Sequence, residues 1–268
     1  MQITTKEFRL FQSLVHHEAG IALSDQKHAL LVGRLAPRMR ALAITSFASY
    51  HDRVRGDREE LARMLDAICT NETQFFREPK QFAFLEESVL PMWRAAGKRQ
   101  IRVWSAGCST GEEPYSIAMT LAAAMPDAAI DVLASDLSRK ALERATAAIW
   151  PIERAAQIPL HYRKSFMLRG GGAQEGNMTV RPELRALIRF ARINLSHETY
   201  PVAGRFDLIF CRNVLIYFDA PSKRRVIDRL LDRLDPNGYL FLGHSESLGN
   251  VERVRAAGPT VYALKDAA

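Results

Sequence analysis

The chain has few cysteines and no cluster of potential metal ligands. Cys69, Cys108 and Cys211 lie far apart, and none belongs to a C-x-x-C pair. No histidines show the spacing of a zinc site either. An odd number of separated cysteines does not suit the disulfide framework of a small secreted protein. We therefore expect free thiols in a reducing compartment, and no bound metal.

Long apolar runs are also missing. No stretch approaches the roughly 18 consecutive apolar residues that a membrane helix needs. The first twenty residues include the charged Lys6, Glu7, Arg9 and Glu18, where a signal peptide would have an uninterrupted apolar core. The sequence therefore predicts a soluble, cytoplasmic protein that is not embedded in a membrane.

Positive charge is in excess, with a formal net charge of +7 at pH 7. A positive field raises the rate of encounter with acidic surfaces, so an acidic partner is favoured. The arginines are spread along the chain, and no recognisable nucleic-acid module or aromatic stacking motif accompanies them. We therefore do not expect nucleic acid as the partner.

The first third of the chain has the apolar spacing of helices. Asp25 is a plausible cap for the second helix, which Pro37 should kink or end, because proline removes a backbone donor and clashes with the preceding turn. A third helix is expected over Thr45–Arg55, and a fourth follows it. We predict a small all-helical domain at residues 1–78 and an interdomain linker helix at residues 79–98.

From residue 99 onward, short apolar runs alternate with amphipathic helices. This alternation is typical of a doubly wound, mainly parallel sheet of the α/β class, and we place that domain at residues 99–268. Ligands of such sheets bind at the carboxyl ends of the strands, where the strand order reverses. The expected strands are Ile101–Ser105, Ile130–Ser135, Leu187–Ile193, Phe206–Cys211 and Tyr239–Leu242, and the expected helices are Glu112–Met125, Ser138–Ala148 and Pro221–Leu234.

One segment does not follow this alternation. Between about residues 162 and 181, two short apolar stretches flank a glycine-rich turn at Gly170–Gly172. Glycines supply the backbone conformations that tight turns between antiparallel strands require. We therefore predict an inserted β-hairpin at this point.

A glycine loop and an acid follow the first two expected strands. Gly107 and Gly111 lie between a strand and a helix, a geometry that lets the backbone approach a ligand closely. Their G-x-x-x-G spacing differs from that of dinucleotide binders, so the loop alone fits a plain tight turn equally well. Asp136 ends the second strand, where it can accept both hydroxyls of a ribose or cap a helix. Together, the loop and the acid indicate an adenosine site.

Two further acids, Glu112 and Glu113, open the helix after the glycine loop. The helix dipole favours acidic residues there whatever the function. At the mouth of a ligand site, however, they would repel a pyrophosphate. S-adenosylmethionine has no phosphate and carries a cationic sulfonium and an amino group. The two acids therefore favour this methyl donor over a nicotinamide cofactor.

Six motifs run from the end of the helical part almost to the C-terminus. They are TNETQFFREP (70–79), VWSAGCSTGEEPYSIAM (103–119), LASD (133–136), INL (193–195), FDLIFCRNVLIYFD (206–219) and GYLFLGHSESL (238–248). In sequence and in order, this series resembles the CheR family of chemotaxis-receptor glutamate methyltransferases. The residues before Thr70 match in helical character more than in distinctive motifs. Gly107-Cys108 departs from the small residues common in relatives, from which we expect no loss of function.

The resemblance implies a Rossmann-like, S-adenosylmethionine-dependent methyltransferase with a small β-subdomain at the predicted hairpin. It implies transfer of a methyl group to glutamate side chains on the cytoplasmic domains of chemoreceptors, in chemotactic adaptation, with S-adenosylhomocysteine as product. In isolation, Asn71 and Thr73 fit ordinary caps or turns, and Asn194 fits a strand end. By similarity, the cofactor site comprises Asn71, Thr73, Arg77, Gly107, Glu113, Asp136, Asn194, Leu195, Asn213 and Val214.

Two residues are the candidates for the methyl-transfer step. Arg77 would orient the incoming carboxylate, because a guanidinium can hold it with two hydrogen bonds and does not deprotonate. Tyr217 would shape the transfer site, although a packed aromatic at the end of a buried strand explains it nearly as well. A carboxylate is already ionised near neutral pH, so no strong general base is needed.

Two surfaces are candidates for the receptor. The basic residues Lys27, Arg34, Arg38 and Arg40 form either a docking face for an acidic coiled coil or a plain solvated face. The loop RGGGAQEG resembles that of family members whose subdomain holds a C-terminal pentapeptide of the receptor by strand addition. Two other functions stay open: a methyltransferase of the same fold with another substrate, and a donor-binding sensor or scaffold without turnover.

Overall fold

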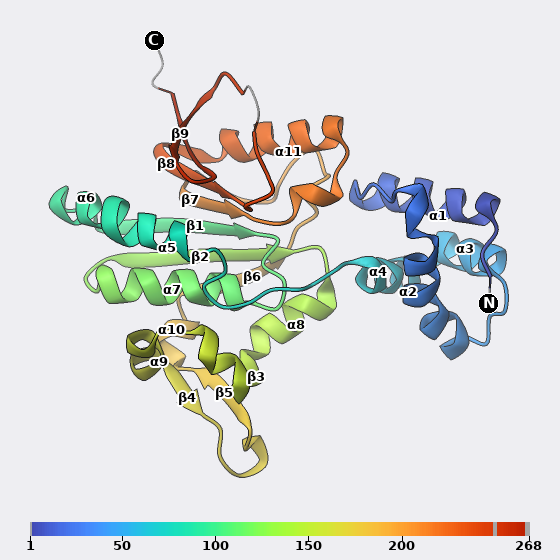
Figure 1. The fold of residues 1–268 in the computed structure, drawn as a ribbon, viewed down its shortest axis with the longest axis horizontal. Helices are drawn as coiled ribbons and strands as arrows, with labels where there is room; N and C mark the ends of the chain where they lie inside the picture. Colours follow the sequence, from blue (N-terminus) through green and yellow to red (C-terminus); the bar gives the residue numbers. More distant parts are fainter. Residues whose placement is uncertain (1, 249–250, 266–268) are drawn as a thin grey trace.

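The computed structural model describes residues 2–248 and 251–265 of the chain. Figure 1 shows a helical bundle at one side of a large sheet that is covered by helices, and a smaller sheet beneath it. The predicted fold class, a mainly parallel α/β sheet with an all-helical N-terminal part and a small β-subdomain, is confirmed.

The N-terminal bundle consists of α1 (Thr5–Ala19), α2 (His28–Ala41), α3 (Phe47–Gly56) and α4 (Arg58–Ile68). Thr4 begins α1 with a capping box, in which its hydroxyl accepts from the Glu7 N–H and the Glu7 carboxylate accepts from the Thr4 N–H (2.9 Å). The bundle has a core of its own, which includes Phe8, Phe11, Val15, Leu31, Leu35, Met39, Phe47, Tyr50, Val54, Met64, Leu65 and Ile68.

The predicted cap of α2 is wrong, and Pro37 does not end the helix. Asp25 lies in a short 3-10 turn, and α2 begins at His28 without a side-chain cap. The Asp25 carboxylate instead accepts from the Gln12 side chain (3.4 Å). The helix also continues past Pro37 to Ala41, because the buried side chains of its last turns, Met39 among them, pack into the bundle core. Packing here outweighs the local cost of the proline.

Two of the basic residues of α2 are engaged inside the bundle. Arg34 donates to the carbonyl oxygen of Cys69 (3.4 Å) and to the Thr70 hydroxyl (3.3 Å), at the end of α4. Arg38 forms an ion pair with Glu60. These two arginines therefore stabilise the bundle and do not contribute to a free basic face.

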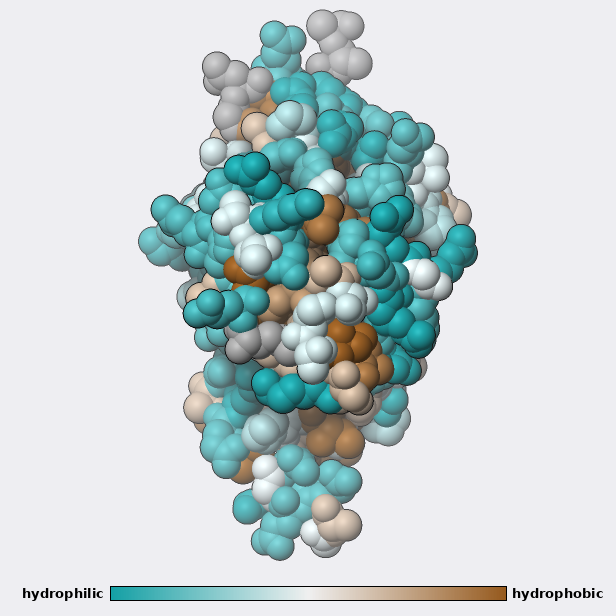
Figure 2. All heavy atoms as spheres, turned by 90° about the vertical axis from the view of Figure 1, so that its right-hand side faces the viewer, coloured by the Kyte–Doolittle hydropathy of each residue, from teal (hydrophilic) through white to brown (hydrophobic). Residues whose placement is uncertain are grey.

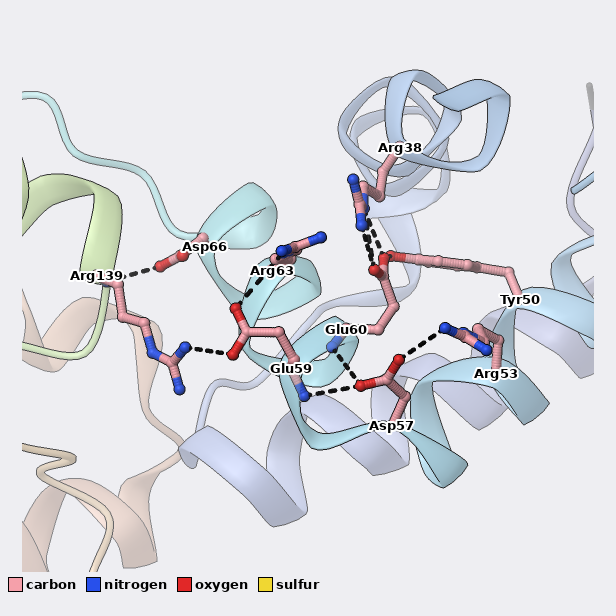
Figure 3. A network of polar contacts seen from close by, with 9 residues as sticks. All are labelled: Arg38, Tyr50, Arg53, Asp57, Glu59, Glu60, Arg63, Asp66 and Arg139. Atoms are coloured by element: carbon pink, nitrogen blue, oxygen red, sulfur yellow. Dashed lines mark hydrogen bonds and ion pairs between the residues drawn. The ribbon is translucent and has the colours of Figure 1, made fainter. Parts of the chain in front are cut away.

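A buried carboxylate ties α2, α3 and α4 together (Figure 3). Glu60 is 3% exposed and accepts from Arg38 Nε (2.8 Å) and from the Tyr50 hydroxyl (2.9 Å). Burial alone would raise the pKa of Glu60, but the hydrogen bonds from Arg38 and Tyr50 lower it below its ordinary value. The neighbouring Glu59 points out of the bundle and pairs with Arg139 at the start of α8 (Arg139–Ala147; 2.6 Å).

The large sheet has the strand order β6-β2-β1-β7-β8-β10-β9. The first five of these strands run parallel, and β10 runs antiparallel to both of its neighbours, β8 and β9. The sequence did not predict this antiparallel pair. The strands are β1 (Gln100–Ala106), β2 (Ala129–Asp136), β6 (Ile188–Arg192), β7 (Phe206–Cys211), β8 (Leu234–Leu242), β9 (Val254–Gly258) and β10 (Val261–Leu264).

Helices cover both faces of this sheet (Figure 1). One face packs on α7 (Glu112–Ala124) and on the helical segment formed by α5 (Pro79–Phe84), a π-helical turn and α6 (Leu90–Ala95). The other face packs on α11 (Ala220–Asp232). The chain proceeds from β1 to one side of the sheet and from β7 to the other, so the strand order reverses between β1 and β7. A ligand site is expected at their carboxyl ends.

The small sheet has the order β3-β5-β4 and is antiparallel. The predicted hairpin is present as β4 (Met167–Arg169) and β5 (Asn177–Val180). Its third strand, β3 (Ile149–Pro151), lies outside the predicted segment and directly follows α8 (Arg139–Ala147). Three residues that end in a proline give too weak a local pattern to predict a strand. The other elements of this region are α9 (Leu160–Phe166) and α10 (Pro182–Arg185).

We predict that Glu60→Ala lowers the free energy of unfolding by about 2–3 kcal/mol, because it leaves Tyr50 and Arg38 without their shared acceptor. Denaturant unfolding, monitored by circular dichroism, measures this free energy of unfolding. Glu59→Ala is the matched control and should have a much smaller effect, since Glu59 is 55% exposed. The contribution of Glu60 should fade on acidification through its lowered folded-state pKa, and not in base. Equal effects of the two substitutions would contradict this role.

Candidate functional site

A cavity of about 350 Å³ lies at the carboxyl ends of β1, β2 and β7. The segment that leads from α4 to α5, residues 69–78, contributes to its wall. All of the residues predicted for the site line this one cavity: Asn71, Thr73, Arg77, Gly107, Glu113, Asp136, Asn194, Leu195, Asn213, Val214 and Tyr217.

The glycine loop after β1 is tightly enclosed. The backbone N–H groups of Gly107 and Cys108 donate to the carbonyl oxygen of Ser135 (2.7 and 2.8 Å), which ties the loop to β2. Gly107 has φ +93°, and a Cβ there would overlap a methyl group of Val214. The chain after β7 therefore touches the loop after β1 through a contact that only glycine permits.

Asp136 links the glycine loop to the start of α8. Its carboxylate accepts from the N–H of Ser109 (2.8 Å) and from the N–H of Ser138 (2.9 Å). Burial raises the pKa of Asp136, and these two N–H groups act in the opposite direction. The N-cap of α8 is Ser138, so Asp136 is not the capping residue itself. It is a buried acid on the cavity wall.

The two acids at the start of α7 have different surroundings. Glu112 is 1% exposed and pairs with Arg154 of the small subdomain (3.1 Å). Glu113 lines the cavity, accepts from the Ser105 hydroxyl (2.7 Å) and pairs with Arg212 (3.3 Å). Burial raises the pKa of Glu113, and the charge of Arg212 opposes that rise. Of the two acids, only Glu113 faces the cavity.

The turn after β7 carries Asn213, Val214 and Tyr217. Asn213 has a left-handed backbone (φ +58°), and a 3-10 turn follows at Leu215–Tyr217. The carboxylate of Glu246, 1% exposed, accepts from the N–H of Asn213 (2.8 Å) and of Ile216 (3.2 Å) and so fixes this turn. Tyr217 is half-buried beyond the end of the strand, which does not fit its alternative interpretation as a packed strand residue.

Arg77 lies in a strained turn. Its neighbours Phe76 (φ +51°) and Glu78 (φ +59°) are both in the left-handed region, which non-glycine residues seldom occupy. Among the described residues, the guanidinium of Arg77 makes one hydrogen bond, from Nη1 to the carbonyl oxygen of Glu72 (3.3 Å). Strain of this kind often gathers at functional sites.

The helical bundle supplies part of the wall, which the sequence did not predict. The Ala22 N–H donates to the Tyr217 carbonyl oxygen (2.7 Å), and Ile21 forms a β-bridge with Phe218. No local pattern could indicate such a contact between distant segments. Figure 2, which faces the bundle, shows a mainly hydrophilic surface with hydrophobic side chains near its middle. The bundle residues on the wall are Ala19, Ile21, Leu23, Lys27, Leu30 and Ile68.

The cysteines are free, as predicted. Within residues 2–248 and 251–265, no group of three or more histidine, cysteine, aspartate or glutamate side chains is arranged to hold a metal ion. In the same part of the chain, no helix has the length and apolar character needed to cross a membrane.

We predict that Gly107→Ala weakens binding of S-adenosylhomocysteine about tenfold or more, because overpacking costs about 1–3 kcal/mol. Calorimetry measures the affinity. Gly97→Ala is the matched control: Gly97 also has positive φ (+66°), but an added Cβ there would meet nothing within 4 Å. Adding Val214→Ala to Gly107→Ala should restore part of the lost affinity. Failure of that rescue would show that the Val214 contact is not the cause.

Two family models match consecutive parts of the chain. "CheR methyltransferase, all-alpha domain" matches residues 6–69, and "CheR methyltransferase, SAM binding domain" matches residues 71–262. The second model covers the part of the chain that forms the sheet and most of the cavity wall.

Curated relatives align over nearly the whole chain. "Chemotaxis protein methyltransferase 2" of Pseudomonas aeruginosa is 39% identical over 97% of this chain and 93% of its own length. "Chemotaxis protein methyltransferase" of Escherichia coli is 39% identical over 98% and 92%, and that of Borreliella burgdorferi is 32% identical over 98% and 95%. The resemblance inferred from the motifs is confirmed, and S-adenosylmethionine is the methyl donor. The chain belongs to the CheR methyltransferase family and is an S-adenosylmethionine-dependent methyltransferase.

Proposed function

We propose that this enzyme methylates glutamate side chains on the cytoplasmic domains of chemoreceptors and acts in the cytoplasm. The observation that carries this proposal is the place of Arg77, a cation on the wall of the donor cavity with most of its N–H groups available among the described residues. A guanidinium in that place suits an acidic acceptor. The names of the relatives, chemotaxis protein methyltransferases, support the same pathway.

The cavity wall fits the methyl donor. When bound, S-adenosylmethionine supplies an electrophilic methyl group on a sulfonium centre. Asp136 would accept the ribose hydroxyls and Glu113 would bind the amino group. Support for these roles is that both are buried carboxylates on the cavity wall. Gly107 lets the backbone lie close to the ligand. The rest of the proposed donor wall is Asn71, Thr73, Arg77, Asn194, Leu195, Asn213 and Val214.

The acceptor chemistry needs orientation more than proton transfer. A glutamate is ionised near neutral pH, and the described residues that line the cavity include no histidine to act as a base. Arg77 would hold the incoming carboxylate with paired hydrogen bonds. Tyr217, on the turn fixed by Glu246, would limit where that carboxylate can lie. Holding reactants in line can supply much of the rate enhancement.

The small subdomain is the proposed site for a receptor tether. Strand β4 pairs with β5 only, so its other edge is open among the described strands. A groove of about 500 Å³ beside it includes Arg163, Arg169 and the apolar Met167 and Met178. A C-terminal pentapeptide could add to the edge of β4 as a strand, with its carboxylate near the arginines.

We predict that the enzyme, given methyl-labelled donor and the receptor cytoplasmic domains of its own organism, forms a base-labile label. Esters of glutamate release methanol in base, and N-methyl products do not. Acceptor domains with glutamate-to-alanine substitutions at the modified positions are the control and should stay unlabelled. Base-stable label, label in nucleic acid, or donor binding with no transfer would each refute the proposed reaction.

The same assay tests the tether. Receptor domains that lack their last five residues should be labelled more slowly at low concentration, because the tether raises the effective concentration of the acceptor. A free peptide of those five residues should bind the enzyme in calorimetry. Equal labelling rates and no peptide binding would remove the tether from the proposal and leave the reaction itself intact.

We predict that Arg77→Ala lowers turnover about 100-fold, because the acceptor loses its orientation. The turnover of Arg77→Lys should lie between that of the wild type and that of Arg77→Ala, since lysine keeps the charge but not the paired hydrogen bonds. Turnover at saturating donor is the measurement, with donor affinity recorded separately. Arg99→Ala is the matched control, because Arg99 is 73% exposed at the opposite end of β1. Wild-type turnover in Arg77→Ala would rule out the assigned role.

A further inference from the structure

Arg212 is a buried charge that the sequence analysis did not single out. It directly follows β7, and its side chain is 1% exposed. Charged side chains are seldom so buried unless they are paired, and each such burial needs compensation. Arg212 also lines the donor cavity. Its partners therefore indicate what it does.

Those partners belong to two different parts of the site. Nη1 pairs with Oε2 of Glu113, the acid on the donor wall (3.3 Å). Nη2 donates to the carbonyl oxygen of Arg77 and lies 3.5 Å from Oε2 of Glu78. One guanidinium thus contacts the donor wall and the strained turn that carries Arg77.

Two buried polar atoms of this arrangement lack hydrogen bonds to any described residue, which lowers its contribution to the stability of the fold. Arg212 Nε and Glu78 Oε2 are buried and have no hydrogen-bond partner among the described residues. Native structures seldom leave such groups unsatisfied, and functional sites are a common exception. Glu78 is itself held in place, because its Oε1 accepts from the backbone N–H of His244 (2.9 Å).

We propose that Arg212 is a positioning residue that fixes the Glu113 carboxylate and the Arg77 turn relative to each other. Through it, the part of the site that binds the donor and the part that orients the acceptor share one buried cation. The inference rests on the proposed roles of Glu113 and Arg77. Its main test is read from product binding, without any acceptor, and turnover is needed only for the Arg212→Lys variant.

The ionisation of Glu113 gives this role a measurable sign. Burial raises its pKa, and Arg212 is the main group that opposes the rise. The other charged or titratable groups that face Glu113 are Glu78 and Arg77 from the strained turn, Cys108 from the glycine loop and Cys211 from β7. Loss of Arg212 would raise the pKa of Glu113 further. As the pH is lowered, the affinity for an amino group should then begin to fall at a higher pH than in the wild type.

A double-mutant cycle with Arg212→Met and Glu113→Gln tests the proposal. We predict that Arg212→Met weakens binding of S-adenosylhomocysteine about tenfold or more, since it leaves buried acids unpaired. In the Glu113→Gln background, the same substitution should have an effect at least about fivefold smaller. Calorimetry across the neutral pH range should show the loss in Arg212→Met growing as pH falls. If the affinity losses of the two single substitutions multiply in the double mutant, or if the pH profile of binding is unchanged in Arg212→Met, the proposal is wrong.

Two further variants protect the test from a folding defect. Arg212→Lys keeps the charge and should retain the wild-type pH profile of binding, with lower turnover because the contact with the Arg77 carbonyl is lost. Arg102→Met, at the opposite end of β1, should leave binding unchanged. If Arg212→Met does not fold, the Arg212→Lys variant tests the proposal instead. A wild-type pH profile of binding with reduced turnover supports the proposal, and a shifted pH profile of binding refutes it.

Discussion

The site depends on how closely the chain after β1 approaches the chain after β7. At Gly107 a methyl group of Val214 fills the space that a side chain would need, and the backbone takes a conformation that suits glycine. This contact lies where the strand order reverses, so the segments that follow β1, β2 and β7 converge on one volume. Asp136 and Glu246 then hold the adjoining loops by accepting backbone N–H groups. The cavity is the space that these constraints leave.

Electrostatics imposes a second constraint. A wall that attracts a cationic ligand needs carboxylates, but the burial that excludes water also favours their protonated form. Glu113 and Asp136 both show this effect. The charged form is stabilised in a different way at each of these two residues. Asp136 is stabilised by backbone N–H groups, whereas Glu113 depends on the charge of Arg212. In the bundle, the buried carboxylate of Glu60 is stabilised by hydrogen bonds from Arg38 and Tyr50.

The sequence predicted most of the parallel sheet and the residues at its strand ends, because apolar periodicity and glycine spacing are local signals. The shared motifs added the connecting segment with Asn71 and Thr73, and the cavity brings these residues together with the strand ends. At the site, the misses were contacts between distant parts of the chain. Neither the bundle wall around Ile21 nor the ion pair of Arg212 with Glu113 leaves a local pattern. The continuation of α2 past Pro37 likewise reflects packing that a local rule ignores.

The bridge between Ile21 and Phe218 has a consequence for how such enzymes can be recombined. The helical bundle is not a detachable module, because the short segment after α1 completes the same wall that the turn after β7 begins. Gly20 has φ +69°, and a Cβ there would come within 2.8 Å of the Phe218 ring. A chimera that joins the bundle of one relative to the sheet of another must therefore exchange both segments as a matched set.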